Sequence, residues 1–155
     1  MNDIRTILIP DSIDAGISVS NKKALFQQLG TMAERTTGVP ARQVVAAISE
    51  RERLGTTGFG GGVAIPHGKI EGLDQVVGCF ARLTAPVDFE AVDRLPIDLV
   101  FLLLSPPDAG AEHLKALASV SRLFRDRQLV AKLRGARSRD AIFALLAGVE
   151  ALDHA

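Results

Sequence analysis

The chain has 155 residues, of which 47% are hydrophobic, and its 18 basic and 18 acidic side chains cancel to a formal net charge of +0. This length supports one domain with a proper core and is too short for two. The balanced charge argues against broad nucleic-acid binding, because phosphates reward clustered Lys and Arg. The single cysteine, Cys79, excludes an internal disulfide, and its apolar neighbours predict a buried, unreactive thiol.

The first 55 residues predict a short apolar segment and two helices. Ile4 to Pro10 fits an edge strand or an irregular lead-in. Ser20 is a candidate N-cap for a helix over Asn21 to Thr37, where apolar residues recur at helical spacing, and Gly38 is the expected stop. Pro40 suits the first turn of a second helix. That helix is expected to end at Gly55, to bury Val44, Val45, Ile48 and Leu54, and to expose Arg42, Glu50 and Glu52.

The rest of the chain predicts strands followed by three helices. Gln75 to Leu83 is expected to be a strand, and the polar loop from Ala85 to Leu95 could hold a short strand around Phe89. The run IDLVFLLL after Pro96 is nearly continuous in apolar residues, which fits a central strand buried on both faces. The expected helices are Glu112–Phe124 with Leu114, Leu117, Ala118 and Leu123 or Phe124 inward, Asp126–Leu133, and a Ser138-capped helix through Leu146 that stops at Gly148 before a frayed tail.

Helices and strands alternate along the chain, and this order predicts an α/β fold. We expect a single domain over residues 1–155, with a core at about 4–146, a tail at 150–155, and helices packed on both faces of a mostly buried sheet. No secretory signal is visible, and no apolar run is long enough to cross a bilayer. The sequence therefore predicts a cytoplasmic protein without direct membrane insertion.

The segment from Gly58 to Lys69 reads GFGGGVAIPHGK and is the strongest functional signal in the chain. Four glycines in five positions allow the backbone to bend sharply and to approach a ligand closely. Val63 to Ile65 predicts a short buried strand that Pro66 ends. His67 is then expected on a turn at the strand end, with glycines leaving room around its ring. Because imidazole is easily neutral near neutral pH, His67 is a candidate nucleophile.

Two further side chains form a candidate constellation with His67. Arg51 lies near the end of the second helix, and His113 lies one turn into the helix after the Ser105–Gly110 break. Two imidazoles, a guanidinium and the positive end of a helix are suited to an anion, and a phosphoryl group is the natural candidate. Arg53 competes with Arg51 for the same role, and periodicity alone leaves both open.

The motif TGFGGGVAIPHGK, preceded by RERLGT, resembles the active-site motif of enzyme IIA of the mannitol/fructose type (EIIA type 2) in the bacterial phosphoenolpyruvate-dependent phosphotransferase system. The residues of this motif are most similar to those of the nitrogen-regulatory branch, and the resemblance covers roughly Ile4 to Leu146. It implies a mixed, roughly five-stranded sheet. It also implies a phosphocarrier in which His67 accepts phosphate on Nε2 from a histidine of HPr or its nitrogen-branch relative NPr. By the same resemblance, Arg51 and His113 steady the phosphoryl oxygens or orient the acceptor ring.

The resemblance favours a mainly regulatory protein whose phosphorylation state controls partners such as sensor kinases or potassium transporters. Two alternatives stay open: a sugar-transport EIIA that passes phosphate to a IIB domain, and a binding module that has lost phosphotransfer. A metal site is disfavoured, because two histidines without a carboxylate or thiol cluster fall short of common zinc sets. No cofactor or ATP is expected, because the glycine cluster lacks a GKS or GKT ending. Lys69 could meet an acidic partner residue or lie solvated, and His154 has no predicted role.

Overall fold

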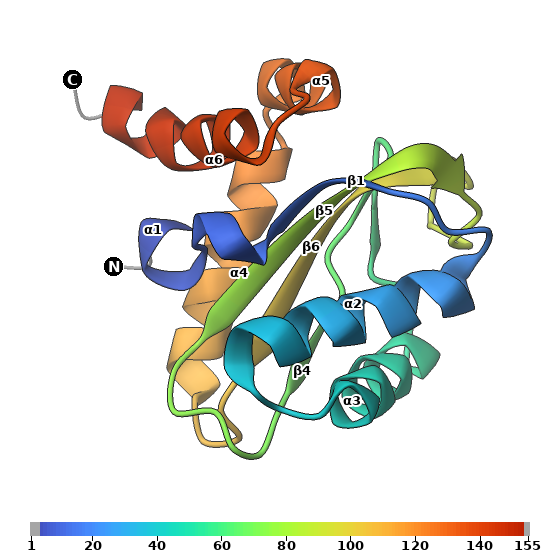
Figure 1. The fold of residues 1–155 in the computed structure, drawn as a ribbon, viewed down its shortest axis with the longest axis vertical. Helices are drawn as coiled ribbons and strands as arrows, with labels where there is room; N and C mark the ends of the chain where they lie inside the picture. Colours follow the sequence, from blue (N-terminus) through green and yellow to red (C-terminus); the bar gives the residue numbers. More distant parts are fainter. Residues whose placement is uncertain (1–3, 154–155) are drawn as a thin grey trace.

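A computed structural model describes residues 4–153 of the chain, with side chains from residue 4 to residue 148 (Figure 1). The elements in chain order are α1 (Ile4–Ile7), the 3₁₀ turn η1 (Pro10–Ser12), β1 (Ile13–Ile17), α2 (Lys22–Thr37), α3 (Ala41–Arg53), β2 (Gly58–Gly60), β3 (Val63–Ala64), β4 (His67–Lys69), β5 (Val77–Val87), β6 (Ile97–Ser105), α4 (Gly110–Phe124), α5 (Arg127–Gly135) and α6 (Arg139–Asp153). This alternation confirms the predicted α/β class.

The described strands form one mixed sheet in the order β1-β5-β6-β3-β2, and β4 also pairs with β6. β5 and β6 are antiparallel, whereas β1 runs parallel to β5. β3 and β4 both run parallel to β6, one after the other along its length, with Ile65 and Pro66 between them. The predicted mixed sheet of roughly five strands is therefore confirmed, with β4 as a short additional strand.

β6 lies at the centre of the molecule and separates two apolar cores. Val100, Leu102 and Leu104 belong to the core shared with α2 and α3. The alternate residues Leu99, Phe101 and Leu103 belong to the core shared with α1, α4, α5 and α6. The two groups of helices cover opposite faces of the sheet (Figure 1). An uninterrupted apolar run suits a strand buried in this way, so the prediction for this segment is confirmed.

The ends of α2 follow local sequence signals. The side chain of Asn21 accepts a hydrogen bond from the backbone N–H of Ala24 at 2.7 Å, so Asn21 rather than Ser20 is the N-cap. Gly38 adopts a left-handed conformation with φ of 82°, which a residue without Cβ adopts readily. Its N–H donates to the Glu34 carbonyl and ends the helix at the predicted position.

The structure differs from the predicted strands and helix ends at several places. The segment before β1 is helical at α1, and β1 itself was not predicted. β5 continues to Val87 through Pro86, which lies where the β5–β6 register shifts and no regular ladder bond is required. Phe89 lies in the following loop, with 0% of its surface exposed. α6 passes through Gly148 to Asp153, since one glycine costs a helix only about 1 kcal/mol.

The buried faces of α3 and α4 also differ from prediction. Leu114 is 66% exposed, and the inward face of α4 is instead formed by His113, Ala116, Val120, Leu123 and Phe124. The predicted stripe began at Leu114, one position after the residue that begins the buried face, and only its last members, Leu123 and Phe124, are buried as predicted. Leu54 follows the last residue of α3 and is 81% exposed, whereas Glu52, expected in water, turns its side chain inward.

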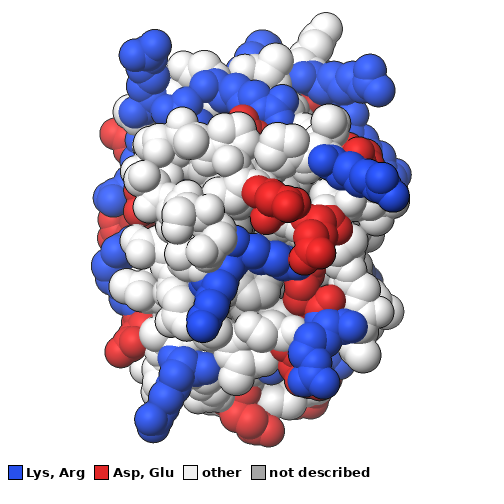
Figure 2. All heavy atoms as spheres, turned by 90° about the vertical axis from the view of Figure 1, so that its right-hand side faces the viewer, with Lys and Arg blue, Asp and Glu red and all other residues white. Residues whose placement is uncertain are grey.

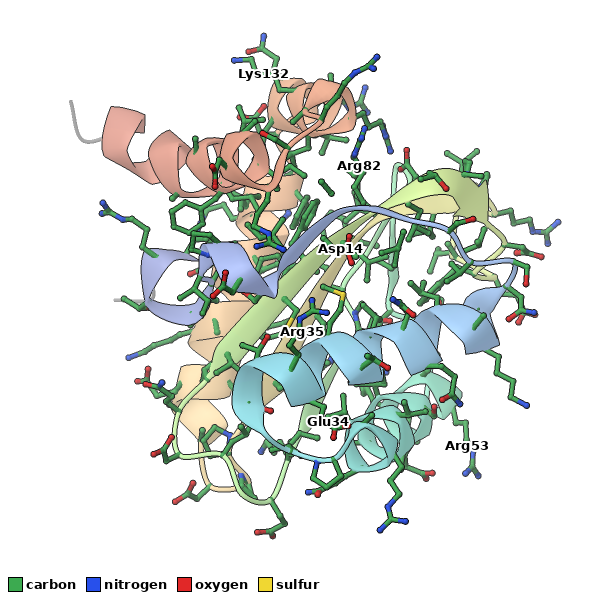
Figure 3. The ribbon with its side chains drawn as sticks, in the orientation of Figure 1. Asp14, Glu34, Arg35, Arg53, Arg82 and Lys132 are labelled. Carbon is green, nitrogen blue, oxygen red and sulfur yellow. The ribbon has the colours of Figure 1, made fainter. Side chains whose placement is uncertain are left out.

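Basic side chains gather across the top of Figure 2, at the height of α5 in Figure 1. Lys132 points away from α5 there, and Arg82 lies between β1 and α5 (Figure 3). The guanidinium of Arg82 donates to the carbonyl oxygen of Ala15 at 2.9 Å and to that of Arg134 at 2.6 Å. These bonds tie α5 to the edge of the sheet. Among the described residues, no helix combines the length and apolarity needed to cross a bilayer.

Candidate functional site

His67 is the first residue of β4 and lies opposite Leu103 of β6. Pro66 separates β3 from β4, and its carbonyl oxygen accepts the N–H of Leu103 at 3.0 Å. The expectation that His67 emerges on a turn is therefore wrong, because strand pairing resumes at His67 itself. The half-buried ring is held by a short strand that is paired with the central strand β6, which makes its position more rigid than a loop would.

Two hydrogen bonds assign a role to each nitrogen of the His67 ring. Nδ1 lies 2.8 Å from the carbonyl oxygen of Ile65, which can only accept, so the ring proton resides on Nδ1. Nε2 lies 3.2 Å from Nε of Arg51, whose N–H donates to it. The lone pair of the ring is therefore on Nε2, the nitrogen remote from the backbone.

The surroundings also keep the ring neutral. Burial lowers the pKa of His67, and the positive charge of Arg51 lowers it further. The hydrogen bond to Ile65 and the negative charge of Glu52 act in the opposite direction, but the net effect on the pKa is a decrease. A histidine with a lowered pKa is unprotonated at neutral pH, so its Nε2 lone pair is available as a nucleophile.

Gly68 explains how α3 brings Arg51 to this ring. A Cβ at Gly68 would lie only 3.3 Å from Cβ of Ala47 and 3.5 Å from its carbonyl carbon, so β4 and α3 are in close contact there. Arg51 is four residues after Ala47 and therefore lies on the same face of the helix. Its Nη1 donates to the carbonyl oxygen of Gly55 at 2.8 Å, which holds the guanidinium over His67.

Arg53 does not share this position. Its side chain is 76% exposed and pairs with Glu50 at 2.8 Å. In Figure 3 it points away from the molecule at the end of α3. Of the two arginines that the sequence left open, Arg51 is the one that faces His67.

Glu52 is a residue of the site that sequence reasoning missed. Its side chain is only 8% exposed, accepts a hydrogen bond from Lys22 Nζ at 2.8 Å, and accepts the backbone N–H of Thr57 at 3.0 Å. Burial raises the pKa of Glu52, but bonds from Lys22, Thr57 and Thr56 outweigh it, so the pKa is lowered overall. Lys22 also lies 4.3 Å from the ring centroid of Phe89. The charged pair fixes the end of α3 beside Arg51.

His113 comes from the opposite side of the sheet. It lies in the first turn of α4 and is 8% exposed, with its ring centroid 5.6 Å from that of His67. Its Nδ1 lies 2.6 Å from Oγ of the buried Ser105. Burial, followed by the charges of His67 and Lys69, lowers the pKa of His113. The structure therefore brings together the three residues that the sequence singled out, His67, Arg51 and His113.

The glycine cluster has a different location from the one predicted. Gly60, Gly61 and Gly62 all have positive φ and form the turn between β2 and β3. Gly62 accepts the N–H of Leu99, which lies four residues and about 13 Å from the partner of His67 along β6. The expectation that these glycines leave room around the His67 ring is therefore wrong. Gly68, inside β4, is the glycine that shapes the space beside that ring.

Three other residues considered in the sequence, Cys79, Lys69 and His154, lie outside this cluster or outside the described residues. Cys79 is 1% exposed, and burial raises its pKa to about 12, so the predicted burial of the thiol is confirmed. Lys69 is exposed at the end of β4. His154 lies outside the described residues. Within the described part of the chain, no group of three or more His, Cys, Asp or Glu residues could hold a metal ion.

A comparison with known protein families finds a match over nearly the whole chain. The family model described as phosphoenolpyruvate-dependent sugar phosphotransferase system, EIIA 2, matches residues 6–149. The chain therefore belongs to this family, and the resemblance stated from the motif is confirmed.

Individual relatives place the chain near the nitrogen-regulatory members of the family. The nitrogen regulatory protein of Bradyrhizobium diazoefficiens is 48% identical over 144 residues, covering 93% of this chain and 94% of that protein. The crystal structure of nitrogen regulatory protein IIA-Ntr from Neisseria meningitidis has a TM-score of 0.87 at 37% identity, covering 92% of this chain and 98% of that one. The fructose-specific EIIA component of Haloferax volcanii is 32% identical over 150 residues, covering 96% of this chain and 97% of that protein.

Proposed function

We propose that this chain is a cytoplasmic phosphocarrier that accepts a phosphoryl group on Nε2 of His67 from a phosphohistidine of an HPr- or NPr-type donor. The observation that carries the proposal is the division of roles on the His67 ring. Ile65 accepts from Nδ1 at 2.8 Å, so the free lone pair belongs to Nε2. The lowered pKa keeps that lone pair unprotonated at neutral pH.

The transfer is an exchange of one P–N bond for another. The Nε2 lone pair of His67 attacks phosphorus, and the bond from phosphorus to the donor's ring nitrogen breaks with its electron pair returning to the donor. The proton on Nδ1 stays in place, where the Ile65 carbonyl stabilises the positive charge that the ring gains. Because charge is spread over the phosphoryl oxygens in a loose transition state, the protein contributes mainly position and positive charge.

Arg51 supplies that charge in our proposal. In the free protein its Nε–H donates to the nitrogen that must attack, at 3.2 Å. The guanidinium must therefore leave Nε2 and turn its planar set of N–H donors to the phosphoryl oxygens as phosphorus arrives. His113, 5.6 Å from His67 between ring centroids, is the second group that we assign to the phosphoryl oxygens.

We further propose that phosphorylation regulates binding to other proteins. A phosphoryl group adds negative charge at a half-buried site, and such a change creates or removes an interface. The nitrogen regulatory relatives support this role, with sensor kinases and potassium transporters as candidate partners by family analogy. A second candidate function is sugar transport with transfer to a IIB domain, and the fructose-specific relative favours it.

Intact-mass measurement after incubation with phosphoenolpyruvate, enzyme I and either HPr or NPr tests the proposal. We expect the chain to gain the mass of one phosphoryl group and His67→Ala to gain none while keeping its fold. Phosphate on the His67→Ala variant would overturn the assignment of His67. Adding fructose- and mannitol-type IIB domains separates the two roles, since a transport EIIA loses its phosphate to IIB and a regulator retains it.

A further inference from the structure

Ser105 is a buried hydroxyl at the end of an otherwise apolar strand. It is the last residue of β6 and is 0% exposed. Alternation along β6 places it on the same face as Phe101 and Leu103, toward α4. Its Oγ lies 2.6 Å from Nδ1 of His113, and its backbone carbonyl is already used by the N–H of Ile70. The polar contact of this buried hydroxyl is therefore with Nδ1 of His113.

The burial of both groups decides which one donates. Among the described residues, Nδ1 of His113 is the one hydrogen-bond partner recorded for the Ser105 hydroxyl. If Nδ1 carried the proton, the serine O–H would be buried without an acceptor, which is costly. The arrangement that satisfies both groups has Ser105 O–H donating to an unprotonated Nδ1. A neutral His113 ring then carries its proton on Nε2.

The other nitrogen of His113 is free to act. In the described part of the chain, no fully buried side-chain nitrogen or oxygen lacks a hydrogen-bond partner, and none is recorded for Nε2 of His113. Nε2 therefore reaches solvent. The two rings, with centroids 5.6 Å apart, thus have opposite tautomers, with a lone pair on Nε2 of His67 and an N–H on Nε2 of His113.

We propose that Ser105 is a positioning residue, which sets the tautomer of His113 and so makes its Nε2–H the donor to a phosphoryl group on Nε2 of His67. The inference rests on the proposed function for its consequence, but not for the tautomer itself. Ser105 forms or breaks no covalent bond. It acts through His113. Without this hydroxyl, the His113 ring can carry its proton on Nδ1, and Nε2 then presents a lone pair that the phosphoryl oxygens repel.

Nitrogen NMR of protein with isotopically labelled histidine reads the tautomer directly. In the unphosphorylated wild-type protein we expect the Nε2–H form of His113 and the Nδ1–H form of His67. Ser105→Ala should shift His113 toward a mixture of tautomers and leave His67 unchanged, and Ser105→Thr should retain the wild-type form. Ser119→Ala, which removes a serine hydroxyl from α4 instead of from β6, is the control variant. A wild-type His113 with its proton on Nδ1 overturns the inference, whatever the variants do.

Transfer kinetics then test whether the tautomer matters. Loss of one hydrogen bond in the transition state predicts about a tenfold lower transfer rate for Ser105→Ala, with an unchanged KM for the donor. In a His113→Ala background the same serine change should have no further effect, because the group through which it acts is gone. An equal decrease in transfer rate in both backgrounds, or a change in KM for the donor without a change in rate, would contradict a role through His113.

The two proposals fail in different ways. If wild-type protein is not phosphorylated by either donor, the proposed function fails while the tautomer measurement still stands. If wild-type protein is phosphorylated at a normal rate and Ser105→Ala matches it in both tautomer and rate, the inference about Ser105 fails alone.

Discussion

Replacing Arg51 by alanine is the perturbation for which the structure makes the sharpest prediction. Arg51 is the one guanidinium whose N–H lies within hydrogen-bond distance of Nε2 of His67 in the described residues, at 3.2 Å. A hydrogen bond from a charged group is worth about 1.5–3 kcal/mol. If that bond passes to the phosphoryl oxygens in the transition state, Arg51→Ala should slow transfer by about ten- to a hundredfold without ending it.

A rapid-quench assay with labelled phosphodonor measures this rate. The assay should be run near pH 8, because loss of Arg51 also removes a charge that lowers the pKa of His67. Even at the ordinary imidazole pKa of about 6.5, the ring is neutral at pH 8, so a slower rate reports lost catalysis and not protonation of His67. Arg51→Lys should fall between wild type and alanine, because it keeps the charge and loses the planar donor set. Arg53→Ala, two positions along the same helix end and 76% exposed, should match wild type. Wild-type rates for Arg51→Ala, or a larger loss at Arg53, would refute the reasoning.

Three further predictions rest on other contacts in the structure. Gly68→Ala should lower stability by about 1 kcal/mol and slow transfer, because its Cβ meets Ala47 at 3.3 Å and displaces α3; thermal melts and the transfer assay report both. Glu52→Gln should lower the free energy of unfolding by about 2 kcal/mol at neutral pH. The folded pKa of Glu52 lies below its ordinary value of 4.5, so this difference should be full well above pH 4.5 and be lost as the pH falls through the folded pKa. Denaturant titrations at several pH values measure it, and a difference that does not change with pH would contradict the pairing of the carboxylate. Cys79, with a pKa of about 12, should resist thiol reagents in the native state and react once on unfolding, so native labelling would exclude the buried position.

The sequence predicted the parts of the fold whose signals are local. The apolar run of β6 and the left-handed stop at Gly38 are both read from neighbouring residues, and both are confirmed. β1 was missed because Asp14 and Gly16 interrupt its apolar pattern, and its stability comes from parallel pairing with β5, more than 60 residues later. β4 was missed for a similar reason, since three residues led by a histidine become a strand only against β6.

In the site, too, residues with a local sequence signal were predicted and those that depend on distant contacts were not. His67, Arg51 and His113 came from a motif whose residue types already indicate anion chemistry, and the structure brings them together. Ser105 and Glu52 were not singled out from the sequence, because neither carries a local signal. Glu52 looks solvated beside charged neighbours, yet its partner Lys22 lies 30 residues earlier. The choice between Arg51 and Arg53 also needed the structure, because it depends on which side of α3 meets β4 at Gly68.

In the proposed transfer phosphorus bonds to Nε2 of His67, and NMR of the phosphorylated, histidine-labelled protein detects that bond. We expect phosphorus coupled to Nε2 of His67, with Nδ1 of that ring still protonated against Ile65 and His113 unmodified. Phosphorus on Nδ1 of His67, or on His113, would contradict the division of roles on which the proposed transfer depends.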